Sequence, residues 1–275
     1  MDLIFYLKAA FIGVIEGLTE FLPISSTGHM IIAEKAIKLS ENSEFTSSFE
    51  VIIQLGAILA VCVYFFKKLW PFVKEKNEQS QRFGMWIKVI AAFIPSVVIG
   101  LIYSKLNMKE ILFKPEVVAF TLVFYGVVII WLEKLNSKKS SFKINEIADI
   151  SLKNAVIVGL FQCLAMVPGT SRSAATIIGA MLLGFSRTVA AEFSFFLAVP
   201  TMFAAAAKDI MDSGLSFTAS EWSALGVGFT VSFIVALGVI KLFIKFIQSR
   251  DFAVFGYYRI AAGAVVALLI YLGFF

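Results

Sequence analysis

Long apolar runs alternate with short polar loops along the whole chain, and several of these runs are close to one membrane crossing in length. A helix needs about 20 apolar residues to span the hydrocarbon core of a bilayer. Lipid offers no partners to backbone N–H and C=O groups, so such runs predict helices that satisfy these groups internally. The pattern predicts an all-α integral membrane protein with six transmembrane helices, at Phe49–Phe66, Trp86–Tyr103, Glu116–Leu132, Thr188–Ala207, Glu221–Phe246 and Phe252–Phe275.

Four further apolar segments form two pairs, and a proline breaks each pair. The first segment is interrupted by two glutamates, and the other three are too short to cross a bilayer. Proline stops a helix, so each pair is expected to turn back on itself. We therefore predict two re-entrant helical hairpins, residues 3–37 and 155–185, built from Leu3–Leu22, Ile24–Ile37, Ala155–Val167 and Ser171–Phe185.

Basic residues are concentrated in alternate loops. Because loops rich in Lys and Arg stay on the inner side of the membrane, both termini are expected outside. The first hairpin then enters from outside and the second from inside. The basic loops carry Lys67, Lys68, Lys74, Lys76, Arg82, Lys88, Lys134, Lys138, Lys139, Lys143, Lys153, Lys241, Lys245 and Arg250, and the poorer loops carry Lys105, Lys109, Lys114 and Lys208.

The two halves of the chain resemble one another. The spacing from glycine to proline is the same within one residue in Gly13–Pro23 and Gly159–Pro168. A turn rich in hydroxyl groups follows each proline. Three predicted crossings separate the units, so their topologies are opposite. We expect a single membrane domain, residues 1–275, made of inverted repeat units at about 1–135 and 150–275. Inverted repeats with broken helices are also a transporter architecture, which leaves a transporter or a lipid carrier flippase open.

Composition excludes several function classes. The 275 residues are 59% hydrophobic with a mean hydropathy of +0.88, which is too apolar for a soluble domain. The only two cysteines, Cys62 and Cys163, lie in apolar segments, so neither a disulfide framework nor a cysteine metal site is expected. The net charge of +5 reflects the basic loops, and no basic stretch interleaved with aromatic residues indicates nucleic acid.

Two carboxylates lie inside the first hairpin. Glu16 and Glu20 are four residues apart and therefore share one face of a helix. A charge at the bilayer centre costs at least ~2.5 kcal/mol, so such residues mark functional sites. Their mutual repulsion calls for a positive group beside them. Arg172, a divalent cation with oxygen ligands and a proton shared by the pair are three alternatives that the spacing leaves open.

Polar residues follow the proline of each hairpin. Ser25, Ser26 and Thr27 supply hydroxyl groups at the start of a helix, and His29, the only histidine of the chain, lies within one turn of them. In the second hairpin, Ser171 is expected to cap a helix whose free N–H groups form an anion site. That site also has the guanidinium fork of Arg172 and the hydroxyl groups of Ser173 and Thr176.

Five residues early in the following spans are expected to support the hairpin tips through hydrogen bonds rather than act directly. Glu50 and Gln54 share a helix face at the start of the first span, and the matching place in the other half is occupied by Glu192, Ser194 and Arg187.

Two stretches carry a resemblance to a known family. Gly17–His29 (GLTEFLPISSTGH) and Pro168–Ser173 (PGTSRS) are similar to the two signatures of the bacterial undecaprenyl-pyrophosphate phosphatases of the bacitracin-resistance type. The resemblance implies a hydrolase of the bacterial inner membrane that removes the terminal phosphate of undecaprenyl pyrophosphate, and so recycles the lipid carrier for cell-wall synthesis. It also implies six spans with two inverted re-entrant hairpins and a divalent cation, Mg or Ca. A homodimer is an open expectation.

The resemblance assigns roles by position. Glu16 and Glu20 correspond to the acidic pair that binds the cation, Ser26 and His29 to the catalytic serine and histidine, and Arg172 to a catalytic phosphate grip. Substrate-binding roles fall on Ser25, Thr27, Ser171, Ser173 and Thr176. The two tips are expected to meet at one pocket facing outside.

The nucleophile remains open at this point. His29 lies three residues after Ser26, so the imidazole can reach the hydroxyl and take its proton. A water molecule activated by Glu20 or His29, or His29 itself, are the other candidates.

Overall fold

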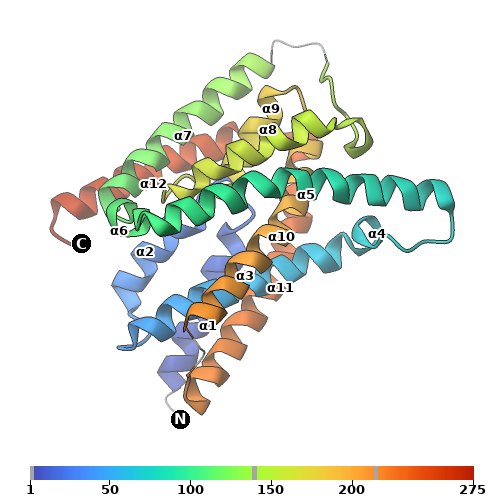
Figure 1. Ribbon diagram of the computed structural model, residues 1–275. Helices are drawn as coiled ribbons and strands as arrows, with labels where there is room; N and C mark the ends of the chain where they lie inside the picture. Colours follow the sequence, from blue (N-terminus) through green and yellow to red (C-terminus); the bar gives the residue numbers. More distant parts are fainter. Residues whose placement is uncertain (1–2, 138–140, 214–215) are drawn as a thin grey trace.

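The computed structural model describes residues 3–137, 141–213 and 216–275, and helices make up almost all of it (Figure 1). No strand occurs within these ranges. The helices, in chain order, are α1 (Leu3–Thr19), α2 (Ser26–Ile37), α3 (Ser43–Tyr64), α4 (Phe66–Leu69), α5 (Lys76–Lys105), α6 (Met108–Leu112), α7 (Pro115–Asn136), η1 (Ile147–Asp149), α8 (Leu152–Cys163), η2 (Leu164–Met166), α9 (Arg172–Leu182), α10 (Arg187–Ser213), α11 (Ala219–Ser249) and α12 (Ala253–Tyr271).

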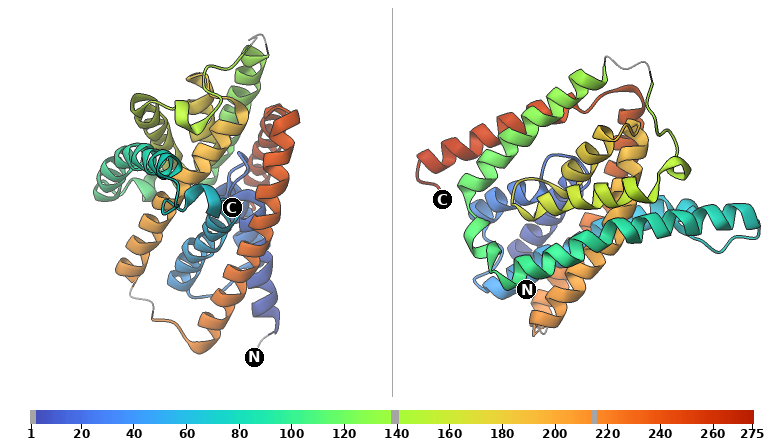
Figure 2. Two further views of the ribbon diagram at one scale, coloured as in Figure 1. Left: turned by 90° about the vertical axis from the view of Figure 1, so that its right-hand side faces the viewer. Right: turned by 45° about the horizontal axis from the view of Figure 1, so that its top comes forward.

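The predicted all-α membrane fold is confirmed. Among the described residues, α3, α5, α7, α10, α11 and α12 are the six helices that are long and apolar enough to cross a bilayer. The largest difference from the predicted bounds is at α5, which begins at Lys76 rather than Trp86. Its first turns are polar, so hydropathy alone missed them, although Lys, Glu and Gln favour helix. Figure 2 shows this end of α5 projecting beyond the bundle.

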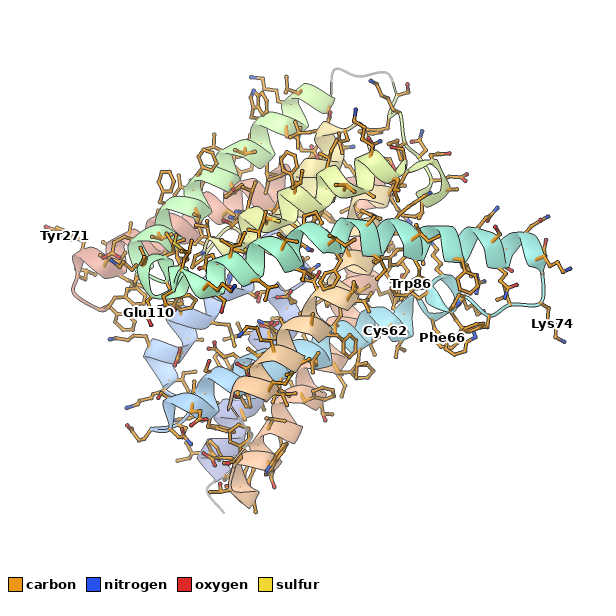
Figure 3. The ribbon with its side chains drawn as sticks, in the orientation of Figure 1. Cys62, Phe66, Lys74, Trp86, Glu110 and Tyr271 are labelled. Atoms are coloured by element: carbon orange, nitrogen blue, oxygen red, sulfur yellow. The ribbon has the colours of Figure 1, made fainter. Side chains whose placement is uncertain are left out.

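The labelled side chains of Figure 3 mark the two ends of the molecule. Lys74 lies at the end where α5 begins, with Phe66 and Trp86 further in, and Glu110 and Tyr271 lie on the opposite side of the view. Aromatic and basic side chains are typical of the interface between membrane and water. The orientation of the chain stays a prediction. Of the basic residues used for it, Lys138 and Lys139 lie outside the described residues, as does the side chain of Lys109.

The two broken segments form helical hairpins, α1 with α2 and α8 with α9. Helix α1 ends at Thr19, before the predicted Leu22, because the chain already turns ahead of Pro23. The second hairpin has the short η2 between α8 and its own proline turn. The re-entrant placement of both hairpins in a bilayer stays a prediction, as does the division into repeat units.

The first arm of each hairpin packs closely on a long helix of the other half of the chain. A methyl group at Gly13 of α1 would lie 2.5 Å from the carbonyl oxygen of Gly228 in α11, and one at Gly159 of α8 would lie 2.0 Å from that of Ala92 in α5. Only glycine permits such backbone contact, which is how helices pack without a hydrophobic driving force in lipid. These contacts fix the position of the first arm of each hairpin along its partner helix.

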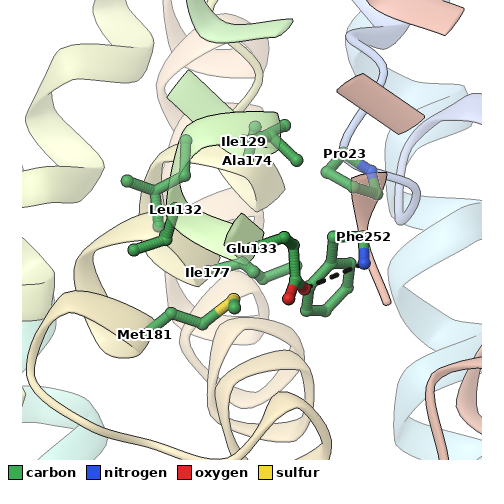
Figure 4. Close-up of a pocket in the computed structure, with 9 residues that line it drawn as sticks. Pro23, Ile129, Leu132, Glu133, Ala174, Ile177, Met181 and Phe252 are labelled. Atoms are coloured by element: carbon green, nitrogen blue, oxygen red, sulfur yellow. Dashed lines mark hydrogen bonds between the residues drawn. The ribbon is translucent and has the colours of Figure 1, made fainter. Parts of the chain in front are cut away.

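A buried ion pair joins the C-terminal end of α7 to the N-terminal end of α10, and the start of α12 is bonded to the same carboxylate. The carboxylate of Glu133 in α7 accepts hydrogen bonds from Arg187 of α10, with Nη2 at 2.6 Å, and from the backbone N–H of Phe252 before α12, at 2.9 Å. Figure 4 shows Glu133 and Phe252 in a small cavity that Pro23 and Ala174 also line. Its volume of about 10 Å³ is near the minimum for a single water molecule, so it is no substrate site.

Candidate active site

The turns at the two hairpin tips have the same backbone form. Ser25 precedes α2 with φ 74°, and its hydroxyl oxygen accepts from the N–H of Gly28 at 3.3 Å. Ser171 precedes α9 with φ 71°, and its hydroxyl oxygen accepts from the N–H of Ala174 at 3.3 Å. Both serines therefore cap a helix as predicted. Each cap leaves neighbouring N–H groups of the first turn open to an anion.

The two tips are in direct contact. Nη2 of Arg172 donates to Oε1 of Glu20 at 2.9 Å, and the hydroxyl of Ser26 donates to Oε2 of the same carboxylate at 2.7 Å. The hydroxyl of Ser173 donates to the carbonyl oxygen of Leu22 at 2.9 Å. The expected meeting of Glu20, Ser26 and Arg172 is thus found in the structure, with Glu20 at its centre and only 9% exposed.

Arg172 is held from several sides. Its Nη1 donates to the carbonyl oxygen of Ser194 in α10 at 3.1 Å, and its guanidinium carbon lies 5.9 Å from the ring centre of Phe21. The hydroxyl of Thr176 donates to that of Ser194 at 2.7 Å and also contacts the carbonyl oxygen of Arg172. Such contacts fix the direction of the guanidinium fork before any ligand binds.

A cavity of about 230 Å³ lies beside these groups. From the tips it is lined by Glu20, Ser26, Thr27, Gly169, Ser171 and Arg172. Its other wall is formed by α3, α5, α8 and α10 and carries Gln54, Ser96, Gln162, Thr201 and Met202. Ser173 and Thr176, by contrast, are fully buried between helices and do not line it. Their hydroxyl groups are used in joining the tips and fixing Arg172.

Glu16 lies deeper than Glu20 and is fully buried. Neither of its carboxylate oxygens has a hydrogen-bond partner, and the carboxylate interacts electrostatically with Glu20, Glu50 and Arg172. A buried carboxylate without partners is costly unless a cation or a proton compensates it. Two carboxylates fit a divalent cation that takes its other ligands from water or phosphate oxygens. The described residues contain no cluster of three or more acidic, histidine or cysteine ligands.

His29 does not contact Ser26, although both lie in the first turn of α2. Its Nδ1 lies 2.7 Å from the carbonyl oxygen of Ser25, and its Nε2 lies 2.6 Å from the hydroxyl of Tyr258 in α12. A carbonyl oxygen only accepts, so Nδ1 carries a proton and Nε2 of the neutral ring accepts from Tyr258. The imidazole stacks on the tyrosine ring with 5.6 Å between centroids, on the side of α2 away from the cavity.

The residues expected to support the tips have different positions. Gln54 lines the cavity, and Glu50 is close enough to Glu16 to interact with its charge. Glu192 is bonded instead to Nζ of Lys68, at 2.8 Å, and lines a separate pocket. Two residues along a helix rotate the side chain by ~200°, so of the predicted residues in α10 Ser194 faces the tips and Glu192 does not. Arg187 is bonded to Glu133 instead.

Arg259 of α12 contacts both tips and was not among the predicted site residues. It is fully buried, and its guanidinium donates to the carbonyl oxygens of Pro23 at 3.2 Å and Gly169 at 2.8 Å. It also donates to the carbonyl oxygen of Thr121 in α7 at 3.2 Å. No motif surrounds it, and the one signal in the sequence was an arginine within an otherwise apolar span. We assign it a positioning role between the tips.

Comparison with known proteins places this chain in a family. The family model described as bacitracin resistance protein BacA matches residues 9–265. The chain is 49% identical over 267 residues to undecaprenyl-diphosphatase 1 of Clostridioides difficile, covering 96% of each chain. It is 50% identical over 262 residues to the undecaprenyl-diphosphatase of Fusobacterium nucleatum, covering 94% of this chain and 98% of that one. The enzyme of the same name from Enterococcus faecalis is 45% identical over 273 residues, 98% of each. The chain therefore belongs to the BacA family of bacitracin resistance proteins.

Proposed function

We propose that this protein hydrolyses undecaprenyl pyrophosphate to undecaprenyl phosphate and inorganic phosphate. Its relatives over nearly the full chain are named undecaprenyl-diphosphatases. The observation that carries the chemistry is the bonding of Glu20 to both Ser26 and Arg172 at the joint of the two tips. A hydroxyl paired with a carboxylate, beside an arginine fork and a helix N-terminus, is suited to phosphoryl transfer.

The geometry favours Ser26 as the nucleophile and Glu20 as its base. The hydroxyl of Ser26 already donates to Oε2 of Glu20, whereas His29 has both ring nitrogens engaged elsewhere. In the first step Glu20 takes the proton, the Ser26 oxygen bonds to the terminal phosphorus, and the bond from that phosphorus to the bridging oxygen breaks. Undecaprenyl phosphate leaves. In the second step water attacks the phosphoserine and the bond from phosphorus to the Ser26 oxygen breaks. The proton held by Glu20 returns to the Ser26 oxygen, and the proton from the water leaves with inorganic phosphate.

Arg172 and the start of α9 bind the oxygens of the phosphoryl group in this scheme. The fork of Arg172 is fixed by Ser194 and faces the same cavity as Ser26. The backbone N–H groups at the first turn of α9 lie beside it and add donors without any rearrangement. Charge on the equatorial oxygens grows during transfer, so these fixed donors stabilise the transition state more than the ground state.

The acidic pair fits a bound divalent cation, Mg or Ca. Glu16 has two buried oxygens without hydrogen bonds, and Glu20 lies beside it. When bound there, the cation would neutralise phosphate charge during attack. The Glu16 oxygens accept from no donor group, whereas Glu20 accepts from Ser26 and Arg172.

We further propose the bacterial inner membrane as the location, with both termini outside and the cavity opening to that side. The basic loops support this orientation through the distribution of Lys and Arg. The product would return the lipid carrier to cell-wall synthesis at the outer face. A homodimer stays a prediction.

The test is phosphate release by the purified protein in detergent. Undecaprenyl pyrophosphate is supplied with Mg, with Ca or with a chelator, and released phosphate is measured. Rapid quench with a terminal [32P] label, followed by peptide mapping, should place the label on Ser26. A Ser26→Ala protein that still turns over at the normal rate without labelled peptide would assign the attack to water. Absence of phosphate release under every condition, with lipid flipping in vesicles, would favour the transporter alternative.

A further inference from the structure

Three polar side chains from different helices are bonded to one another in the wall of the cavity that faces the two tips. Nε2 of Gln162 in α8 donates to the hydroxyl oxygen of Ser96 in α5 at 2.7 Å and to that of Thr201 in α10 at 3.2 Å. All three residues line the cavity, and Gln162 and Ser96 are buried. These three residues form the polar wall, and the reaction steps described above use none of them.

The polar wall lies beside the phosphate grip. Met202, which follows Thr201 in α10, also lines the cavity, and its sulfur lies 3.5 Å from Nη2 of Arg172. The same guanidinium nitrogen is bonded to Glu20, which holds Ser26. A phosphoryl group bound by Arg172 in this cavity therefore has Ser26 on one side and the polar wall on the other.

The bonds within the polar wall leave one acceptor and one donor unused. The hydroxyl of Thr201 has a single proton, which the carbonyl oxygen of Leu197 accepts at 2.8 Å, so Oε1 of Gln162, 3.4 Å away, receives no strong bond from it. Ser96 already accepts from Gln162, and within the described residues its own proton has Sγ of Cys163 at 3.8 Å, a weak acceptor. A carboxamide oxygen and a hydroxyl proton thus remain for a ligand.

This combination favours water over a phosphate oxygen. A water molecule both donates and accepts, and it needs two or more polar partners in a buried site. An unprotonated phosphate oxygen only accepts, so it would be repelled by the carboxamide oxygen of Gln162. The cavity of about 230 Å³ has room for water beside a phosphoryl group.

Hydrolysis of the phosphoserine needs water on the far side of the phosphorus. In phosphoryl transfer the attacking and leaving oxygens are roughly in line, and the Ser26 oxygen is the leaving group of this step. Glu20 is bonded to Ser26 and so lies on the leaving side, and His29 does not line the cavity. The wall opposite Ser26 is therefore where the attacking water must be held.

We propose that Gln162 and Ser96 bind the water that hydrolyses the phosphoserine, and that Thr201 fixes the orientation of the carboxamide. The water donates one hydrogen to Oε1 of Gln162 and accepts from the hydroxyl of Ser96, which leaves a lone pair for the phosphorus. The bond from the water oxygen to phosphorus forms as the bond from phosphorus to the Ser26 oxygen breaks. Glu20 returns its proton to Ser26, and the hydrogens of the water leave with inorganic phosphate. The proposal rests on the proposed function and on its phosphoserine step.

A pulse–chase experiment measures the second step by itself. The protein is labelled briefly with undecaprenyl pyrophosphate carrying a terminal [32P] label, excess unlabelled substrate is added, and the loss of label from Ser26 is followed by rapid quench. Gln162→Met keeps the length of the side chain but has no strong acceptor. We expect it to form the phosphoserine at the normal rate and to lose the label ~10-fold more slowly, the scale of one neutral hydrogen bond.

Ser96→Ala is the second variant, because Gln162→Met also leaves two buried hydroxyl groups without their donor. It removes a single hydroxyl group, and the loss of label should be slower by a similar factor. Ser232→Ala is the matched control, since Ser232 is a buried serine in the span α11 and does not line the cavity. The control should form and lose the label as wild type does. If Gln162→Met forms no label, the result for Ser96→Ala decides.

The outcomes separate this inference from the proposed function. If the wild-type protein releases no phosphate, the proposed function fails. If it labels Ser26 but Gln162→Met and Ser96→Ala lose the label as fast as Ser232→Ala does, the polar wall does not bind the water and the inference is overturned. Slower formation of the label with a raised KM and a normal loss would assign these residues to the lipid phosphate instead. Turnover without any labelled peptide would overturn the inference and leave hydrolysis itself standing.

Discussion

The two hairpins share a backbone design and differ in the chemistry that it carries. The caps Ser25 and Ser171 have almost the same positive φ, 74° and 71°, and each accepts from the third N–H after it. A left-handed conformation costs an L-residue ~1–2 kcal/mol. Both turns have this unfavourable conformation at the same place, which indicates that each hairpin requires the same backbone shape at its tip.

The side chains on these matching backbones are different. Three residues after the packing glycine, α1 has Glu16 and α8 has Gln162. Gln162 is satisfied by Ser96 and Thr201, at 2.7 and 3.2 Å, while Glu16 has no hydrogen-bond partner. The residue after the cap is Ser26 in one turn and Arg172 in the other. The first hairpin provides carboxylates and a nucleophile, and the second provides the phosphate grip, so neither half suffices alone.

Among substitutions that test this division of roles between the hairpins, Glu20→Gln should have the largest effect on activity. The amide keeps the size of the side chain but cannot take the proton of Ser26, and it loses the charge that pairs with Arg172. We expect a fall in kcat of ~10³-fold, within the range for loss of a general base. Steady-state phosphate release in detergent measures it. A variant within tenfold of wild type would assign the base to another group.

The grip of the second hairpin is tested by Arg172→Lys. Lysine keeps the positive charge but has no fork to bond Glu20 and Ser194 and still reach phosphate. The expected loss in kcat is ~10²-fold, the scale of one transition-state donor. Lys68→Arg, at a cation paired with Glu192 outside the cavity, is the matched control and should be neutral. Near-normal activity of Arg172→Lys would mean that positive potential alone is sufficient.

Glu16→Gln gives the first hairpin the neutral side chain that the second has at Gln162. If Glu16 binds the cation, the Mg concentration for half-maximal rate should rise by about tenfold or more, by analogy with the 10–100-fold losses from disturbed metal sites. Titration of activity with Mg measures this. Unchanged Mg dependence with a reduced rate would remove Glu16 from cation binding and give it an acid–base role instead.

The smallest effect is expected where the two hairpins are alike. Ser171→Gly loses the side-chain cap, which costs a few tenths of a kcal/mol relative to serine, but relieves the strain of φ 71°. The net change in unfolding free energy should stay within ~1 kcal/mol. Ser171→Ala loses the cap and keeps the strain, so it should be the less stable of the two. Thermal unfolding in detergent compares them, and the same order is expected at Ser25. The reverse order at either position would show that the greater entropy of glycine in the unfolded chain outweighs the relief of strain.

The sequence predicted the architecture because membrane helices have a strong local signal. The six spans follow from apolar length, and the hairpin turns follow from Pro23 and Pro168. Helix ends were less predictable, as the polar start of α5 at Lys76 shows. The meeting of Glu20 with Arg172 could be predicted because each charge needed compensation in an apolar surrounding.

Contacts that depend on helix rotation or on distant partners could not be predicted. His29 was expected to face Ser26 from its spacing, but Tyr258 and the carbonyl oxygen of Ser25 hold its ring on the side of α2 away from the cavity. Glu192 was placed near the tips by its position in the repeat, whereas its helix face turns it to Lys68. Arg259 belongs to no motif, and its acceptors are backbone carbonyls, which carry no sequence signal.

Arg259 also bears on the order in which the site is assembled. Synthesis proceeds from the N-terminus, so both tips leave the ribosome before α12 does. Until then the carbonyl oxygens of Pro23 and Gly169 lack the guanidinium that joins them in the finished protein. A nascent chain that stops before residue 259 would hold every predicted catalytic residue and still have its two tips unlinked at this point. Insertion of the last helix is therefore the step that adds this link between the tips.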